Sequence, residues 1–262
     1  MRVQQLFDLS NKSALVTGGG RGIGRFIAKG LAEAGATVFI ASRKLENCQT
    51  VVDEIKADGG KAIAVKADVG KKEDIDALAD QVLDQTDHLN ILVNNAGIVW
   101  AAPTLEYPVE AWDKVFNVNV RGLWLLSQRM IVHMKEKGGG SIIHVASTSA
   151  FRGAPEEEQP VIAYNASKGA VVALTTDMGV KLGVHKIRVN AIAPGPFMTD
   201  MMTHVTSDED KLDDFNRGIP LRRSGSENDM KGVAVFLASD ASAYMTGQTI
   251  LVDGGMISLA RS

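Results

Sequence analysis

The chain has 262 residues, of which 45% are hydrophobic and 23% charged, an ordinary balance for a globular protein in water. A net charge of −3 offers no general attraction to nucleic acid or anionic lipid, which bind clustered lysine and arginine, and the longest apolar runs are too short to cross a bilayer. The one cysteine, Cys48, cannot form an internal disulfide, and residues 1–9 lack the apolar core of a signal peptide. We therefore expect a cytoplasmic protein with neither nucleic acid nor a membrane as partner.

Short apolar runs alternate along the chain with longer stretches of helical period. Strands are predicted over residues 13–17, 37–41, 62–67, 90–93, 141–146, 187–192 and 249–252. Helices are predicted over residues 23–34, up to Ile55, and over 75–83, 112–134, 164–182 and 229–238. Uniformly apolar strands that alternate with helices predict an α/β fold, a doubly wound parallel sheet (Rossmann-like) with helices on both faces.

Two stretches, residues 150–161 and 194–223, look irregular, and both follow predicted strands. Ligands bind at the carboxyl ends of the strands in this architecture. A glycine-rich turn, residues 17–24 (TGGGRGIG), joins the first strand to the first helix. Glycine permits positive φ and a close approach to a pyrophosphate at a helix N-terminus. The G-x-G-x-x-G spacing is not met, because the sixth residue from Gly18 is Ile23. Simple chain reversal is the alternative for this turn.

Further motifs follow in order along nearly the whole chain. They are residues 94–97 (NNAG), Asn119, Ser147, residues 164–168 (YNASK), Pro194-Gly195 and residues 252–255 (VDGG). Together with the T-G-x-x-x-G-x-G pattern of residues 17–24, they resemble the short-chain dehydrogenase/reductase family. The resemblance implies an NAD(P)-dependent oxidoreductase that interconverts a ketone and a secondary alcohol. It also implies a single domain over residues 1–262, with a cofactor-binding part at about 10–150 and a catalytic and substrate part at about 140–262.

Four catalytic residues follow from the resemblance. Tyr164 and Lys168 are four residues apart in a predicted helix, so they lie one turn apart on one face. A free tyrosine has a pKa near ~10, and we expect the nearby ammonium to lower the pKa of Tyr164. By resemblance, Tyr164 exchanges a proton with the substrate oxygen, and Lys168 holds the nicotinamide ribose. Ser147 hydrogen-bonds the substrate oxygen, and Asn119 positions a water linked to the lysine.

The spacing between Ser147 and Tyr164 departs from the family pattern. Tyr164 follows Ser147 by 17 positions (164 − 147), whereas the family places about a dozen residues between them. The surplus falls in residues 154–160 (APEEEQP), which we expect to bulge outward without moving either end. Its three glutamates, residues 156–158, are expected to be solvated. The alternative is that they line the mouth of the site and disfavour anionic substrates.

The resemblance also implies residues that contact the cofactor. They are Gly18, Gly20, Arg21, Gly22, Ile23, Gly24, Ser42, Arg43, Asp68, Val69, Asn95, Ala96, Gly97, Tyr164, Lys168, Pro194, Gly195 and Thr199. NAD-selective relatives carry an acidic residue at the end of the second strand, whereas this chain has Ser42 there, followed by Arg43. With Arg21 in the glycine turn, these residues suit the 2′-phosphate, so we predict that NADP(H) is preferred over NAD(H). The alternative is that both arginines are simply exposed cations.

Several substrates stay open at this point. A 3-ketoacyl-(acyl-carrier-protein) reductase needs basic residues at its entrance, which residues 156–158 would oppose. A polyol or sugar-acid dehydrogenase is favoured by the similarity of residues 41–46 and 229–234 to gluconate 5-dehydrogenase-like members. The alternative from another class is a catalytically silent NADP-binding regulator. The sequence decides neither the substrate nor the direction of the reaction.

Three further expectations concern the substrate pocket, the assembly and metals. Residues 197–216 begin with Phe197, Met198, Met201 and Met202, which suits a partly apolar pocket. The resemblance implies a homotetramer in which helices 112–134 and 164–182 pair across one two-fold axis and residues 247–262 across another. The five histidines show no paired ligand spacing, so no metal site is expected; His144, in the fifth strand, is expected to lie in the core or to support the site from behind.

Overall fold

A seven-stranded parallel sheet forms the centre of the computed structural model, which describes residues 2–199 and 209–259. The strands are β1 (Ser13–Thr17), β2 (Thr37–Ser42), β3 (Lys61–Lys66), β4 (Leu89–Asn94), β5 (Gly140–Val145), β6 (Ile187–Pro194) and β7 (Thr249–Val252). They lie in the order β3-β2-β1-β4-β5-β6-β7, and all neighbouring pairs are parallel. The predicted doubly wound sheet is confirmed, and each predicted strand ends within two residues of the observed one.

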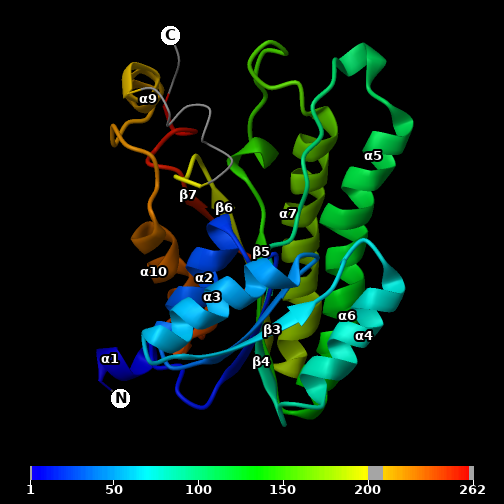
Figure 1. Ribbon diagram of the computed structural model, residues 1–262, viewed down its shortest axis with the longest axis vertical. Coiled ribbons are helices and arrows are strands. Elements are labelled where there is room, and N and C mark those ends of the chain that lie inside the picture. The colour runs from blue at the N-terminus through cyan, green and yellow to red at the C-terminus, as the bar shows by residue number, and fades with distance from the viewer. Residues whose placement is uncertain (1, 200–208, 260–262) are drawn as a thin grey trace.

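Helices cover both faces of the sheet (Figure 1). One face carries α2 (Gly22–Glu33), α3 (Leu45–Ala57) and α10 (Glu227–Ala238). The other carries α4 (Lys72–Leu83), α6 (Leu123–Glu136) and α7 (Ile162–Leu182), with α5 (Val109–Phe116) ahead of α6. None of the helices in the described ranges is long and apolar enough to span a bilayer.

Two helices were not predicted, α1 (Val3–Leu6) and α9 (Glu209–Arg217). The second lies within the stretch that was expected to be irregular. Its sequence, EDKLDDFNR, is almost entirely polar, so it carries no apolar period by which a helix can be recognised.

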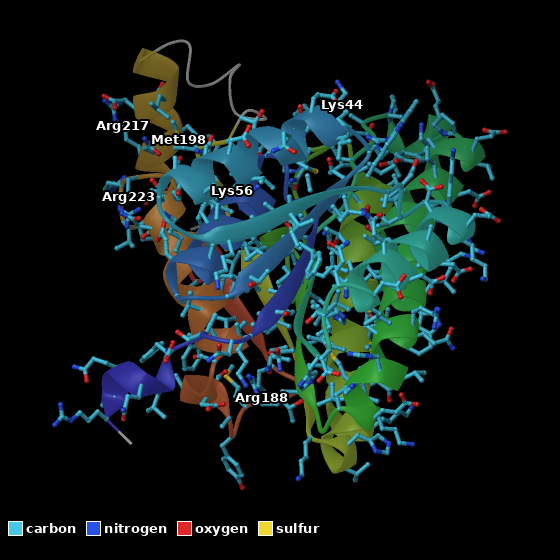
Figure 2. The ribbon with its side chains drawn as sticks, turned by 60° about the horizontal axis from the view of Figure 1, so that its bottom comes forward. Lys44, Lys56, Arg188, Met198, Arg217 and Arg223 are labelled. Atoms are coloured by element: carbon cyan, nitrogen blue, oxygen red, sulfur yellow. The ribbon has the colours of Figure 1, made fainter. Side chains whose placement is uncertain are left out.

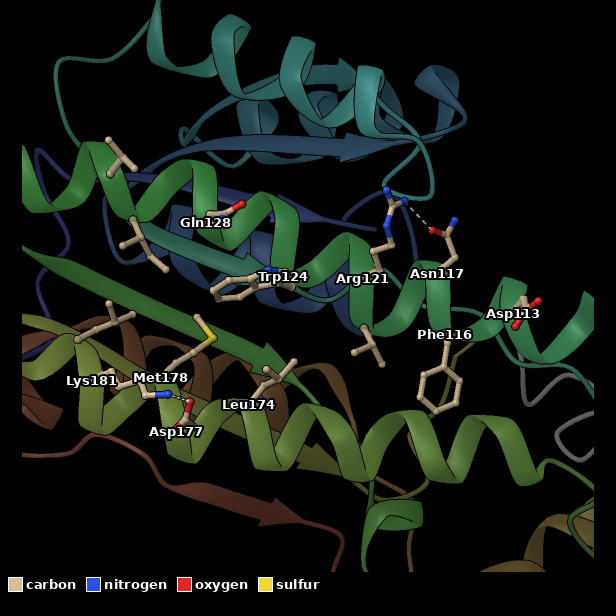
Figure 3. Close-up of a pocket in the computed structure, with 14 residues that line it drawn as sticks. Asp113, Phe116, Asn117, Arg121, Trp124, Gln128, Leu174, Asp177, Met178 and Lys181 are labelled. Carbon is tan, nitrogen blue, oxygen red and sulfur yellow. Dashed lines mark hydrogen bonds and ion pairs between the residues drawn. The ribbon is translucent and has the colours of Figure 1, made fainter.

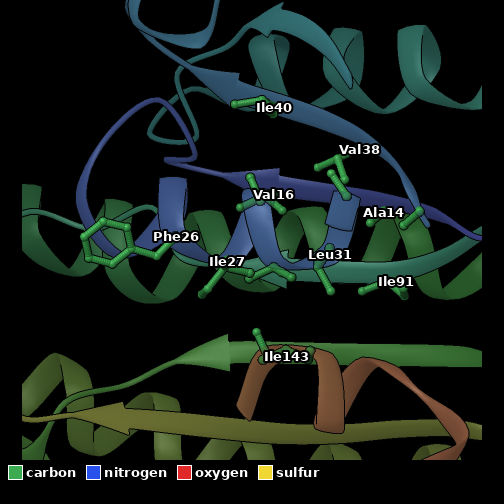
Figure 4. Packing of buried hydrophobic residues seen from close by; sticks show 14 of the residues in the cluster. Ala14, Val16, Phe26, Ile27, Leu31, Val38, Ile40, Ile91 and Ile143 are labelled. Atoms are coloured by element: carbon green, nitrogen blue, oxygen red, sulfur yellow. The ribbon is translucent and has the colours of Figure 1, made fainter. Parts of the chain in front are cut away.

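The core lies in two layers, one on each side of the sheet. Successive side chains of a strand point to opposite faces, so Val16 packs in the layer below α2 while its neighbour Leu15 packs in the layer below α6. Figure 4 shows the first of these layers, in which Ile27 and Leu31 of α2 pack beside Val16. Because both faces are covered, the inner strands are buried and mostly apolar, with a few buried polar side chains such as Asn94, His144 and Asn190.

The predicted helix over residues 112–134 is interrupted, and there the prediction is wrong. After α5, a π-helical turn, η2 (Asn117–Gly122), precedes α6. Apolar spacing cannot show such a turn, because one widened turn leaves the pattern on either side intact. The π-helical turn lies directly against the loop after β3, which is possible because residue 122 is glycine. A Cβ on Gly122 would lie 2.1 Å from the carbonyl oxygen of Val69. The turn also buries Asn119, of which 1% is exposed.

The loops that carry the candidate site leave from the carboxyl ends of the strands. Figure 2 shows Lys44, which follows β2, and Met198, which follows β6, at the same end of the molecule. Arg188, near the start of β6, lies at the opposite end. The candidate site residues predicted after β1, β2, β4, β5 and β6 therefore lie at one edge of the sheet.

We expect Gly122→Ala to lower the free energy of unfolding by about 1–3 kcal/mol, because its methyl group meets the backbone of Val69. Gly232→Ala is the matched control, since Gly232 lies inside α10 and a Cβ there meets no described atom within 4 Å. That change should raise stability by up to ~1 kcal/mol. Urea titration of both variants measures the two effects, and equal changes would contradict the assigned contact.

Candidate active site

The glycine turn between β1 and α2 is shaped for an anion. Gly18 and Gly22 have φ values of 64° and 53°, a backbone region that glycine occupies without strain. A Cβ on Gly24 would lie 2.3 Å from the carbonyl oxygen of Gly18. Arg21, at the N-cap of α2, makes no side-chain capping bond, so the first N–H groups of the helix remain for a phosphate. These features fit the pyrophosphate of a dinucleotide.

The end of β4 is tied directly to this turn. The Asn95 side-chain amide donates to the carbonyl oxygens of Thr17 (2.8 Å) and Gly18 (3.1 Å). The Thr17 hydroxyl accepts from the backbone N–H groups of Asn95 (3.1 Å) and Ala96 (3.2 Å). The residues predicted after β1 and after β4 therefore lie together, at the point where the strand order reverses. Sequence reasoning gave Thr17 no role, although it opens the quoted motif.

The end of β2 lies beside the same turn. The Ser42 hydroxyl donates to the carbonyl oxygen of Lys44 (2.9 Å), which holds the start of α3. A Cβ on Gly20 would lie 3.0 Å from the Cβ of Asn47, so α3 closes over the glycine turn. Arg21 and Arg43 are exposed, and neither guanidinium has an ion pair or hydrogen bond within the described part of the chain.

Asp68 and Val69 lie between β3 and α4, against the π-helical turn. The Asp68 carboxylate accepts from the backbone N–H of Gly70 (2.9 Å), while its own backbone N–H donates to Asp74 (2.9 Å). Asn117 donates to the carbonyl oxygen of Gly70 (2.7 Å). These bonds hold the loop after β3 against η2.

Asn119 connects three of the predicted elements. Its Oδ1 accepts from the backbone N–H of Ile98 (2.8 Å), and its Nδ2 donates to the carbonyl oxygen of Ile98 (2.9 Å) and to Ser167 (3.0 Å). A Cβ on Gly97 would lie 3.3 Å from Asn119 Oδ1 and 3.5 Å from Lys168 Nζ. Gly97, Asn119 and Lys168 therefore converge. Ser167 was not singled out from the sequence, although it lies inside the quoted YNASK motif.

Lys168 is buried below Tyr164. Its ammonium donates to the carbonyl oxygen of Val145 (2.7 Å) and lies 5.6 Å from the centre of the Tyr164 ring. Burial lowers the pKa of Lys168 to about 8. Burial also raises the pKa of Tyr164, against the opposing effect of its hydrogen bond with Ser147. The expected lowering of the Tyr164 pKa is therefore wrong for the chain by itself: removal of the phenol from water outweighs the opposing effect of Ser147, and the pKa of Tyr164 is raised.

Ser147 and Tyr164 are neighbours in spite of their wide spacing, since the Ser147 side chain is close enough to lower the pKa of Tyr164. Ser147 lies at the start of a 3-10 turn, η3 (Thr148–Ala150), and accepts from the backbone N–H of Ser149 (3.1 Å). The intervening residues 154–160 do not simply bulge outward, because they are hydrogen-bonded to Ala102 and Thr104 in the loop after β4. Their three glutamates are exposed, as expected.

The segment after β6 lies over the glycine turn. A Cβ on Gly22 would lie 3.5 Å from the methyl carbon of Thr199, and the Gly195 N–H donates to the carbonyl oxygen of Val252 (2.9 Å). Pro194 is the last residue of β6. Of the expected apolar pocket residues, Met198 is 38% exposed, whereas Phe197 is buried against Gly225. Met201 and Met202 lie outside the described residues.

His144 lies in the core of β5, as expected. Its Nδ1 is 2.9 Å from the Thr175 hydroxyl, and burial lowers its pKa to about 3, so the ring is neutral. Within residues 2–199 and 209–259, no three histidine, cysteine or acidic side chains are grouped as metal ligands.

Comparison with known proteins agrees with this geometry. The family model described as enoyl-(acyl carrier protein) reductase matches residues 18–257. The 5-keto-D-gluconate 5-reductase of Escherichia coli is 36% identical over 255 residues, which cover 97% of this chain and 99% of that protein. A 3-oxoacyl-(acyl-carrier-protein) reductase of Staphylococcus epidermidis is 39% identical over 248 residues, covering 94% and 99%. The chain belongs to the short-chain dehydrogenase/reductase family.

A solved structure of the same family extends the comparison. It is a gluconate 5-dehydrogenase from Burkholderia cenocepacia in complex with NADP and tartrate, with a TM-score of 0.91 and 34% identity, covering 99% of this chain and 100% of that one. As a short-chain dehydrogenase/reductase, the chain is an oxidoreductase that acts on CH–OH and C=O groups.

The buried Lys168 gives this dehydrogenase a specific pH dependence of stability. Between about pH 8 and pH 10.5 the unfolded chain binds more protons at this residue than the folded chain, so the free energy of unfolding rises with pH across that window. From pH 7.5 to 10.5 we expect the free energy of unfolding of the wild type to rise relative to that of Lys168→Met by on the order of 2–3 kcal/mol. Lys72→Met, at an exposed lysine paired with Asp76, is the control. Parallel curves for wild type and Lys168→Met in urea titrations would contradict the assignment.

Proposed function

We propose that the chain is a cytoplasmic, NADP(H)-dependent enzyme that interconverts a ketone and a secondary alcohol by hydride transfer, with Tyr164 as the acid and base. The observation that carries this proposal is the convergence of Ser147, Tyr164, Lys168 and Asn119 beside the glycine turn. The cytoplasmic location rests on Cys48, a free and buried thiol that needs no oxidising compartment.

The roles of the side chains follow from their protonation and contacts. A bound nicotinamide dinucleotide would supply or accept the hydride at the substrate carbon. In reduction, the Tyr164 hydroxyl donates its proton to the carbonyl oxygen, which the Ser147 hydroxyl holds. In oxidation, the phenolate takes the hydroxyl proton. Burial raises the pKa of the Tyr164 phenol, which favours the protonated form that donates in reduction.

Lys168 and Asn119 organise the space below Tyr164. The Lys168 ammonium would hold the ribose hydroxyls of the nicotinamide half, for which two of its three hydrogens remain beyond the bond to Val145. Asn119 fixes the turn after β4 against α7, and its Oδ1 keeps one lone pair for a water. A catalytically silent NADP-binding protein would not need these four residues gathered at one site, which favours the enzyme.

We expect Tyr164→Phe to lower kcat by ~10²–10⁴-fold, because it removes the proton donor and keeps the ring. Cofactor affinity should change little. Tyr244→Phe is the matched control, since Tyr244 is fully exposed. Ketone-dependent consumption of NADPH measures both variants. A Tyr164→Phe enzyme that keeps more than half of its activity would rule out this role.

The preference for NADP(H) rests on the end of β2. No carboxylate stands at Ser42 to repel a 2′-phosphate, and the exposed guanidinium of Arg43 follows. Arg21 lies in the glycine turn, so a phosphate between the two would meet two permanent cations. The NADP named in the Burkholderia cenocepacia complex is consistent with this choice.

Arg43→Ala should therefore weaken NADP(H) binding by roughly ten- to a hundredfold, since a hydrogen bond to a charged group contributes ~1.5–3 kcal/mol. NAD(H) binding should be nearly unchanged. Arg217→Ala, on the exposed helix α9, controls for loss of surface charge. Fluorescence titration gives both dissociation constants. Equal losses for the two cofactors, or a wild type that favours NAD(H), would show that the pocket was misread.

We also propose a homotetramer, in which an apolar groove between α6 and α7 receives the same groove of a second copy. The groove, shown in Figure 3, has a volume of about 850 Å³. Phe116, Trp124, Leu174 and Met178 line it. Charged residues of both signs also lie along it, namely Asp113, Arg121, Asp177 and Lys181. A two-fold axis would bring such opposite charges together around an apolar centre.

Trp124→Glu should convert the tetramer into smaller species, because it places a charge in the apolar centre of the groove. Leu105→Glu is the control, since Leu105 is 99% exposed and lies outside the groove. Sedimentation velocity at micromolar concentration distinguishes the species. A wild type that sediments as a stable monomer would contradict the assembly.

A further inference from the structure

The segment between Ser147 and Tyr164 is anchored as a wall of the site rather than bulging freely. The backbone N–H of Ala102 donates to the carbonyl oxygen of Pro160 (2.9 Å), and the backbone N–H of Thr104 donates to the Glu156 carboxylate (2.8 Å). Both partners belong to the loop that follows β4, so the loops after β4 and β5 are joined. Within the segment, a turn closes on Pro155, whose carbonyl oxygen accepts from two backbone N–H groups (3.0 Å each).

One side chain of this segment turns inward. Residues 156–158 are exposed, whereas Gln159 is half-buried and its Nε2 lies 3.4 Å from the Ser149 hydroxyl, to which it donates. The backbone N–H of Ser149 donates to Ser147 Oγ (3.1 Å), and Ser147 is a neighbour of Tyr164 that lowers its pKa. Ser149 therefore connects the two sides: its backbone contacts Ser147, and its hydroxyl contacts the carboxamide of Gln159.

The carboxamide of Gln159 is only half satisfied. Its Oε1 is shielded from water and has no hydrogen-bond partner in the described part of the chain. A buried acceptor without a donor costs free energy, and native proteins seldom leave one. The bond to Ser149 is long and therefore weak, so the side chain can turn its oxygen toward an incoming donor.

The hydrogen-bonding capacity of Gln159 and Ser149 determines which chemical group of a ligand can bind to both. Gln159 Oε1 requires a donor, while the Ser149 hydroxyl, which accepts from Gln159, keeps its own hydrogen to donate. A hydroxyl group both donates and accepts, so it matches both atoms. A thioester carbonyl, a carboxylate or an alkyl chain offers no hydrogen to the oxygen.

We propose that Gln159, held by Ser149, is a specificity residue that binds a hydroxyl group of the substrate close to the reacting carbonyl. The preferred substrates are therefore hydroxylated ketones of the polyol or sugar-acid kind rather than 3-ketoacyl thioesters. This inference rests on the proposed ketone–alcohol reaction at Tyr164, and it assigns a function to the residues that lengthen the loop.

The test compares Gln159→Met with wild type on two kinds of ketone. Methionine keeps the length of the side chain and removes its hydrogen bonds. The hydroxylated probes are 5-keto-D-gluconate and L-xylulose, and the hydroxyl-free probes are ethyl acetoacetate and cyclohexanone. We expect kcat/KM for the hydroxylated probes to fall roughly tenfold, with the hydroxyl-free probes changed by less than about twofold. Ser149→Ala should shift the same ratio in the same direction.

Glu157→Gln is the matched control, because Glu157 is exposed on the same segment, and it should leave both classes of substrate unchanged. Melting temperature and NADPH affinity are measured on every variant, so a folding defect is recognised by equal losses on all probes. An unchanged ratio of the two kcat/KM values, or a wild type active only on hydroxyl-free ketones, overturns the role of Gln159 alone. A wild type inactive on all four ketones contradicts the proposed reaction itself.

Discussion

Lys168 carries an ammonium group into an almost dry interior, where the carbonyl oxygen of Val145 is its one hydrogen-bond partner among the described residues. Removal of such a cation from water is costly, and the cost appears as a pKa lowered to about 8. The same removal from water raises the pKa of Tyr164, so one constraint shifts the titration of both groups. The remaining hydrogens of the ammonium would be satisfied by the ribose hydroxyls of a bound cofactor, which links the buried charge to cofactor binding.

The surrounding structure holds this cation in place from several directions. α7 supplies Lys168 and Tyr164 from one helix face, and the π-helical turn brings Asn119 against Gly97. That turn is positioned in part by the close approach of Gly122 to Val69. The loop after β4, in turn, is bonded through Asn95 to the glycine turn. The acid–base group and the phosphate site are therefore parts of one hydrogen-bonded edge of the sheet.

Much of this arrangement could be predicted from the sequence, for reasons that are physical. The strands are buried on both faces and therefore appear as apolar runs, and the ends of parallel strands meet at one edge, which places the motifs together. The π-helical turn could not be predicted, because one widened turn leaves no mark on apolar spacing. Helix α9 has too few apolar residues to show a period. The inward orientation of Gln159 beside exposed glutamates depends on its contact with Ser149, and sequence spacing does not reveal that contact. The raised pKa of Tyr164 depends on burial, which sequence spacing does not reveal either.

The most direct test of the central claim is an NMR titration of the Lys168 ammonium in protein labelled with isotopic lysine, with Lys168→Arg to assign its signal. The account predicts a midpoint near pH 8, well below that of the exposed lysines. A midpoint at or above 10.5, the ordinary value for lysine, would show that the ammonium is solvated and that burial does not set the chemistry of this site.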